Sequence, residues 1–190
     1  MSPNQIKETF GVDYLTSQYF LKEEDCHLVR KKSLESLGDA TLTSEASQLG
    51  VKFSKELSKG IVNDIYIKKH SLSIGWGAYA RKSLGAGDFL GEYTGNVRKK
   101  VRPFFDGNDY CFSYPELSLF FMQYTIDAKL AGNEMRFINH SDNPNCEAAL
   151  VFHEEFIKVV FIALMKIEKD EHLTISYGKP YWSSKEKEDL

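Results

Sequence analysis

Residues 132–146 read Gly-Asn-Glu-Met-Arg-Phe-Ile-Asn-His-Ser-Asp-Asn-Pro-Asn-Cys. Hydrogen-bonding side chains crowd this stretch on both sides of the apolar pair Phe137 and Ile138. Polar side chains at this density either solvate a surface loop or lie buried in a network in which each group has a partner. The apolar pair favours burial, and a polar surface loop is the alternative.

Two glycine-rich segments lie earlier in the chain. Residues 75–80 read Gly-Trp-Gly-Ala-Tyr-Ala, and residues 91–95 read Gly-Glu-Tyr-Thr-Gly. Closely spaced glycines let the backbone approach a ligand or adopt positive φ. A Gly-x-Gly after a strand is more often a plain tight turn, and no third glycine opens a helix here as a dinucleotide-binding fingerprint requires.

A further segment lies near the end of the chain. Residues 170–178 read Asp-Glu-His-Leu-Thr-Ile-Ser-Tyr-Gly, and Tyr181 and Trp182 follow. A Tyr-Gly pair that ends a strand close to other aromatic residues is equally compatible with core packing. Each segment taken alone is therefore weak evidence for a site.

In order and spacing, the segments together resemble the SET domain, a β-clip fold of protein-lysine methyltransferases. That family shows G-x-G, E-Y-x-G, R-F-I-N-H-S-x-x-P-N and E-x-L-x-x-x-Y-G, which correspond here to residues 75–77, 92–95, 136–145 and 171–178. The resemblance covers about residues 61–182, and its most specific part is Asn-His-Ser. It implies that the chain uses S-adenosylmethionine to methylate the ε-amine of protein lysines.

The expected architecture is mainly β, a SET β-clip fold with a pseudoknot, preceded by a helical N-terminal extension. We expect the N-terminal extension over residues 1–60, the SET domain over 61–182 and a charged tail over 183–190. Helical patterns cover 22–37 and 43–57. A short helix is expected near residues 132–138, and strands at 62–69, 89–93, 110–114, 124–127, 148–152, 156–163 and 173–176.

The resemblance assigns cofactor contacts residue by residue. In SET folds the Tyr-Gly strand threads the Asn-His-Ser segment, which would bring Tyr177 beside Asn139. Asn139 and His140 would bind the cofactor's amino group and adenine, with His140 acting largely through its backbone. The residues expected to bind the cofactor are Gly75, Trp76, Gly77, Tyr110, Arg136, Phe137, Asn139, His140 and Tyr177.

The resemblance also assigns the catalytic residues, Tyr177 as the principal one and Tyr93 as the residue that holds the amine. A free lysine has a pKa near ~10.4, and an apolar channel lowers it by disfavouring the ammonium. Tyrosine rings exclude water from such a channel, while their hydroxyls orient the amine without adding charge. The expected channel residues are Tyr93, Phe112, Ile175, Tyr177, Tyr181 and Trp182.

The net charge and the cysteine content limit the kinds of partner that the chain is expected to bind. A formal net charge of −3 argues against direct nucleic-acid binding and permits attraction of a basic protein such as a histone or histone-like tail. The three cysteines are far apart, no zinc-binding cysteine cassette is present, and no metal is expected. We find neither a secretory signal nor an apolar run of membrane-spanning length, which predicts a soluble, intracellular protein.

Several alternatives stay open at this stage. Asp142 stands where the family often has Cys, and Asn96 replaces a second Glu. The chain could methylate a non-histone protein, or serve as a SET-fold binding module without activity. Its compact form is similar to free-standing bacterial or viral SET proteins, so export into a host cell is one hypothesis and a homodimer another. Residues 98–102, Arg-Lys-Lys-Val-Arg, are expected to be a solvated loop.

Overall fold

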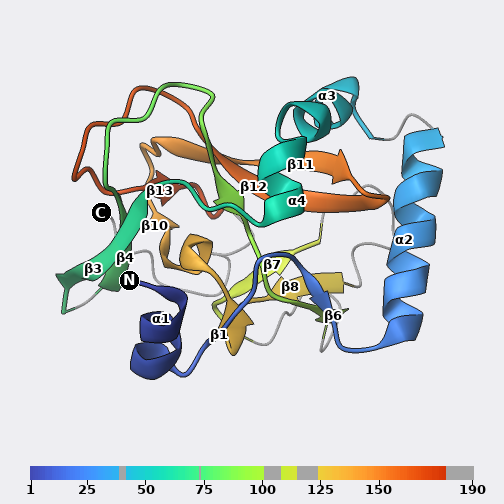
Figure 1. Ribbon diagram of the computed structural model, residues 1–190, viewed down its shortest axis with the longest axis horizontal. Coiled ribbons are helices and arrows are strands. Elements are labelled where there is room, and N and C mark those ends of the chain that lie inside the picture. Colours follow the sequence, from blue (N-terminus) through green and yellow to red (C-terminus); the bar gives the residue numbers. More distant parts are fainter. Residues whose placement is uncertain (39–41, 73, 101–107, 115–123, 179–190) are drawn as a thin grey trace.

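The computed structural model of this chain describes residues 1–38, 42–72, 74–100, 108–114 and 124–178. These residues form a mainly β structure with helices at its edges (Figure 1). The helices are α1 (Pro3–Phe10), α2 (Glu23–Gly38), α3 (Ser44–Lys52), α4 (Ser54–Lys59) and the 3-10 helix η2 (Glu134–Phe137). The strands are β1 (Asp13–Tyr14), β2 (Tyr19–Phe20), β3 (Ile65–Ser71), β4 (Gly75–Ala80), β5 (Phe89–Glu92), β6 (Asn96–Lys99), β7 (Cys111–Ser113), β8 (Tyr124–Asp127), β9 (Ala131–Gly132), β10 (Asn139–His140), β11 (Cys146–His153), β12 (Phe156–Ala163) and β13 (Thr174–Ile175).

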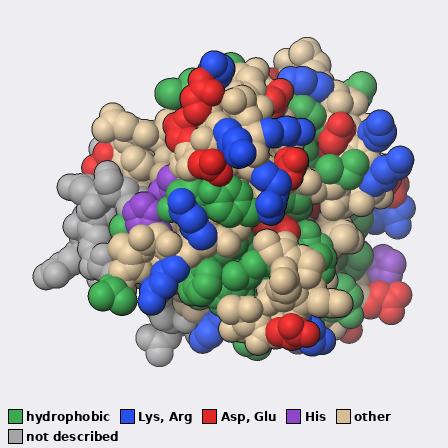
Figure 2. Space-filling model, turned by 60° about the vertical axis from the view of Figure 1, so that its left-hand side comes forward, with side chains coloured by type: hydrophobic (Ala, Val, Ile, Leu, Met, Phe, Trp, Pro, Cys, Tyr) green, Lys and Arg blue, Asp and Glu red, His purple; other side chains and the backbone are tan. Residues whose placement is uncertain are grey.

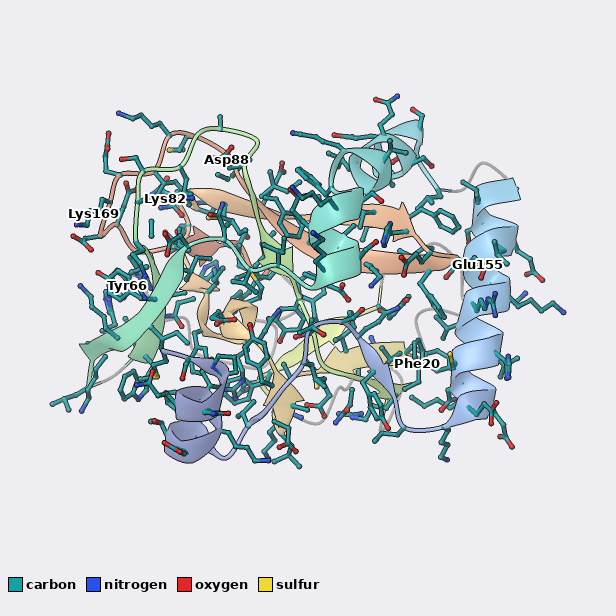
Figure 3. All side chains as sticks on the ribbon, viewed as in Figure 1. Phe20, Tyr66, Lys82, Asp88, Glu155 and Lys169 are labelled. Carbon is teal, nitrogen blue, oxygen red and sulfur yellow. The ribbon has the colours of Figure 1, made fainter. Side chains whose placement is uncertain are left out.

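The strands form several small sheets. The orders are β11-β12-β5, β2-β6-β8-β7, β3-β4, β1-β9 and β10-β13. The β11–β12 hairpin turns through Glu154 and Glu155, whose φ angles are 47° and 68°. Two consecutive left-handed residues suit the twist of a two-residue hairpin, although Asn and Gly adopt them more readily than Glu. Glu155 pairs with Arg30 of α2 (Figure 3), so a salt bridge holds this turn against the helix.

The longer predicted strands and the helix predicted at 22–37 are confirmed, whereas the helix predicted at 43–57 is two helices, α3 and α4, divided at Phe53. Strands β8 and β12 coincide with the prediction, and η2 lies within the expected short helix. The basic run is a correction, because its residues Arg98 and Lys99 belong to β6, which pairs with β8. The Arg98 side chain is only partly exposed, because its guanidinium pairs with the Asp127 carboxylate at 2.7 Å. Of the two-residue strands, β13 lies within the predicted strand 173–176, whereas β1, β2, β9 and β10 were not predicted, since pairing partners rather than local pattern define them.

The core holds two groups of apolar side chains. The larger lies between the sheets and includes the fully buried Leu90, Ile126 and Phe161. The smaller packs α3 and α4 onto the β11-β12-β5 sheet through residues such as Phe53 and Val160. Burial of apolar surface is the main stabilising contribution in both groups.

The N-terminal extension is woven into the rest of the fold. Strands β1 and β2 pair in parallel with β9 and β6. Between β1 and β2, the Gln18 backbone N–H and the Ser17 hydroxyl donate to Glu92, which also pairs with Lys158 at 2.9 Å. Both ion-pair side chains are almost fully buried. The added hydrogen bonds offset the desolvation of this pair, so the N-terminal extension helps to satisfy the core.

The predicted crossing of two distant segments is confirmed. Strands β10 and β13 lie in parallel, with Asn139 opposite Thr174. Buried Asn145 locks the crossing, since its Nδ2 donates to the His172 carbonyl at 2.8 Å and its Oδ1 accepts the Thr174 amide at 2.9 Å. Its Nδ2 also lies 3.1 Å from the Glu171 carboxylate. The Asn145 side chain therefore supplies hydrogen bonds across the crossing that β10 and β13, with two residues each, are too short to provide.

Replacing Asn145 by Ala should lower the free energy of unfolding by about 2–4 kcal/mol, because it leaves buried polar groups without partners. Urea unfolding followed by circular dichroism measures this loss. Asn143→Ala is the matched control, because the Asn143 side chain is exposed. Equal stability of the two variants would contradict the role given to Asn145.

Candidate functional site

Tyr177 lies directly beside the Asn-His-Ser segment. Its hydroxyl donates to the Ile138 carbonyl at 3.0 Å, and its backbone amide donates to His140 Nδ1 at 3.1 Å. The rings of Tyr177 and His140 are 5.5 Å apart. The Tyr177 hydroxyl therefore has a fixed position, because it donates its proton to a backbone carbonyl.

Asn139 joins this segment to the Gly-Trp-Gly strand β4. Its Nδ2 donates to the Trp76 carbonyl at 3.1 Å and lies 3.3 Å from His172 Nε2. A Cβ at Gly77 would come within 2.7 Å of His172 Nε2 and 3.2 Å of Asn139 Nδ2. Only glycine fits this position, so the strand backbone approaches the Asn139 and His172 side chains closely.

Tyr93 belongs to a buried aromatic group. Its ring centroid lies 5.4 Å from that of Phe112 and 5.7 Å from that of Phe161, and its hydroxyl donates to the Tyr110 carbonyl at 2.8 Å. Burial raises the pKa of Tyr93 well above its ordinary value, and neighbouring Tyr177 adds to the rise. Tyr93 is therefore neutral and contributes an apolar ring surface to the site, and it does not act as a base.

Arg136 places a cation over aromatic rings at the same end of the fold. Its guanidinium lies 4.0 Å from the Tyr110 ring centroid and 4.8 Å from that of Phe137, and its Nε donates to the Ala128 carbonyl. Burial lowers the pKa of Arg136 from its ordinary value, while Tyr110 acts in the opposite direction. These contacts hold Tyr110, Arg136 and Phe137 in one layer.

Trp76 packs against a residue of the N-terminal extension. The Phe10 ring, at the end of α1, meets Trp76 edge-on at 5.1 Å and Phe137 at 4.8 Å. The fully buried Ile6 anchors α1, and Tyr14 donates a hydrogen bond to Glu134 of η2 at 2.8 Å. The N-terminal extension thus packs against Trp76 and Phe137, two of the residues predicted to bind the cofactor.

The predicted residues therefore fall into connected sets. Direct contacts link Tyr177 to His140 and to the carbonyl before Asn139, link Asn139 to Trp76, and link Tyr93 to Phe112 and Tyr110. Ile175 is buried and lies opposite His140 in the β10–β13 pair. Tyr181 and Trp182 lie outside the described residues.

Two further residues near this site have no signal in the local sequence. His172 stands at a position that the family pattern leaves unspecified, yet it contacts Asn139. Phe10 lies more than sixty positions before Trp76, and no local pattern connects them. Only the pairing of distant strands brings such residues into contact.

The family follows from a match over residues 75–178, more than half of the chain, to the sequence model of the SET domain. The chain belongs to the SET-domain family. Histone-lysine N-methyltransferase MEDEA of Arabidopsis thaliana is 34% identical over 167 residues, covering 82% of this chain and 22% of the relative. Histone-lysine N-methyltransferase set-2 of Caenorhabditis elegans is 31% identical over 170 residues, covering 84% of this chain and 10% of the relative.

Solved structures confirm the fold. A chain of Chaetomium thermophilum Polycomb Repressive Complex 2 bound to GSK126 superposes with a TM-score of 0.57 at 25% identity, covering 67% of this SET protein and 17% of that chain. The predicted mainly β SET fold is therefore correct. This chain spans less than a quarter of the length of these relatives.

One departure from the SET pattern has a structural counterpart. Asp142, at the position where the family often has Cys, lies 3.4 Å from Nε2 of His140. Since His140 Nδ1 accepts the Tyr177 amide, the carboxylate faces the other ring nitrogen. Asp142 thus favours the tautomer with its proton on Nε2, the form in which Nδ1 can accept.

The described part of the chain holds no group of three or more His, Cys, Asp or Glu side chains arranged to bind a metal ion. In the same residues, no helix is both long and apolar enough to span a membrane.

Phe10→Ala should lower the free energy of unfolding by about 1–3 kcal/mol, because it removes a half-buried ring from two aromatic contacts. In a Trp182→Phe background, Trp76 is the single tryptophan, and its emission should shift to longer wavelength as water reaches the ring. Thr9→Ala, an exposed change in the same helix, is the control. An unchanged Trp76 spectrum would contradict the contact.

His172 should make stability depend on pH. Burial, with His70 and Lys68, lowers its pKa to about 4 from the ordinary 6.5, so the unfolded chain binds the proton more tightly between these values. The free energy of unfolding contributed by His172 is present above pH 6.5 and is lost as the pH falls toward 4. Urea unfolding at pH 7 and pH 5 should show a larger loss for the wild type than for His172→Gln. Equal losses would show that His172 titrates normally.

Proposed function

We propose that this chain is a protein-lysine N-methyltransferase that uses S-adenosyl-L-methionine as methyl donor. The observation that carries the proposal is the position of Tyr177 beside Asn139, across the β10–β13 crossing. The relatives named above, which are histone-lysine N-methyltransferases, support the same reaction class. Tyr93 and Tyr177 are the proposed catalytic residues.

The chemistry of the site fits the amino-acid end of this cofactor. Because the Trp76 carbonyl only accepts, the Asn139 atom that faces it is the amide nitrogen, and the side-chain oxygen is left for a ligand's donor. An ammonium group is such a donor. Gly77 allows close approach of the strand backbone to such a group.

The bound cofactor would supply an electrophilic methyl group on a sulfonium. Tyr177, whose proton is donated to the Ile138 carbonyl, would present oxygen lone pairs that orient polarised C–H and N–H groups. Tyr93 and Phe112 would exclude water around the lysine and favour its neutral amine. Neither tyrosine acts as a strong base, so alignment supplies most of the acceleration, roughly 7–11 kcal/mol in well-oriented reactions.

The proposed substrate is a basic protein, with histones or histone-like tails as the first candidates. The named relatives act on histone lysines, and a chain of net charge −3 does not repel a basic tail. Ile175 lacks the hydroxyl that would restrict a channel to one methyl group, so the proposed products include di- or trimethyllysine.

The first experiment is incubation of core histones and histone-like basic proteins with the protein and labelled cofactor, followed by mass spectrometry. The expected result is a mass gain on lysine in multiples of one methyl group. Cofactor binding by calorimetry without transfer to any protein would instead support the alternative of a SET-fold binding module.

Tyr177→Phe should lower the transfer rate by about 100-fold or more, because it removes the oriented oxygen and leaves the ring in place. The affinity for S-adenosylhomocysteine should change by less than about threefold, because His140 and Asn139 remain. Tyr19→Phe is the control, since Tyr19 is 53% exposed and belongs to β2, which pairs with β6 and not with β10 or β13. Unchanged transfer by the Tyr177 variant would overturn its assignment.

A further inference from the structure

The orientation of the Asn139 side chain depends on two acceptors. One is the Trp76 carbonyl, at 3.1 Å, and the other is His172 Nε2, at 3.3 Å. Both bonds use the same amide nitrogen, whose two hydrogens are thereby occupied. If His172 carried a proton on Nε2, it would face the Asn139 amide donor with a second donor.

The backbone of His172 is held on both sides. Its carbonyl accepts from Asn145 Nδ2 at 2.8 Å, and an isolated antiparallel bridge pairs it with Tyr79 of β4. The neighbouring Leu173 amide donates to the Ala78 carbonyl at 2.9 Å. These bonds carry the His172 side chain over Gly77, where a larger residue would collide with it.

Stacking against neighbouring aromatic rings fixes the orientation of the His172 imidazole. The His172 ring lies 4.8 Å from Tyr79 and 4.5 Å from His70, with interplanar angles of 21° and 23°. Tyr79 stacks in turn on Tyr66 of β3, labelled in Figure 3. The stacked rings leave the His172 ring little freedom to rotate away from Asn139. Figure 2, in which the left-hand side of Figure 1 comes forward, shows histidine side chains at the surface.

The surroundings of His172 oppose its protonation. Lys68 Nζ lies 4.1 Å from the centroid of the Tyr79 ring, and both Lys68 and His70 disfavour a second positive charge. Together with burial they lower the pKa of His172 to about 4. At neutral pH the imidazole is uncharged, and the bond from Asn139 requires that Nε2 be its unprotonated nitrogen.

We propose that His172 is a positioning residue of the cofactor site: its Nε2 accepts an Asn139 amide hydrogen and so keeps the Asn139 oxygen as the acceptor for the cofactor's amino group. The inference rests on the proposed use of S-adenosylmethionine. It goes beyond the family pattern, in which the residue between Glu171 and Leu173 is not specified.

The test measures the dissociation constant of S-adenosylhomocysteine, which carries the same amino group, by calorimetry at pH 7.5. His172→Leu removes the acceptor and should raise the constant about tenfold, whereas His172→Gln offers an amide oxygen and should stay within about threefold of the wild type. His27→Leu, on the exposed side of α2, is the control and should have no effect.

A double-mutant cycle separates positioning from general structural damage. In an Asn139→Ala background, His172→Leu should cause no further loss of affinity, because the group that His172 orients is gone. If His172→Leu does not fold, His172→Phe keeps a ring against Tyr79 and His70 and removes the acceptor, and it replaces the leucine variant in the cycle.

The outcomes distinguish the two proposals. A wild-type protein that fails to bind S-adenosylhomocysteine would overturn the proposed function, and the role of His172 with it. Wild-type binding that His172→Leu leaves unchanged, or losses that add fully in the Asn139→Ala background, would overturn the positioning role alone.

Discussion

The hydrogen bonds between Asn145 and the segment 171–174 are the constraint on which the rest of the structure depends. They hold a pair of two-residue strands that has almost no ladder of its own. Through that pair the chain brings Tyr177 to His140 and His172 to Asn139. Tyr177 and His172 therefore owe their places to one buried side-chain amide, that of Asn145, which both donates and accepts across the crossing.

Local patterns predicted the elements that have a local cause. Strand β12 is apolar at every position except Lys158 and α2 has a helical composition, so both were predicted from the sequence. The Asn-His-Ser and Tyr-Gly motifs located the crossing because a family resemblance linked them. His172 and Phe10 were missed, since their importance comes from contacts with residues far away in the chain. Strand β6 was misread because its arginine is neutralised by Asp127, a partner that charge counting alone does not reveal.

The N-terminal extension supplies hydrogen bonds that the buried motif residue Glu92 requires. Glu92 is buried, and a buried carboxylate needs both a counter-ion and hydrogen-bond donors. Lys158 supplies the charge, while Ser17 and Gln18 supply donors from the extension. The two residues of the Glu92-Tyr93 motif thus have different roles. Glu92 binds the N-terminal extension to the sheet, and Tyr93 packs in the aromatic group beside Tyr177.

The parallel pairing of β10 with β13 has a consequence for synthesis of the protein. A chain emerges from the ribosome from its N-terminus, and long-range parallel contacts form late. Strand β10, together with Asn145, must therefore wait for the segment that carries Thr174 and Tyr177 before its polar groups find partners. Until then Leu173 and Ile175 cannot complete the core, and the apolar surface that stays exposed makes the nascent chain prone to aggregation and a target for chaperones.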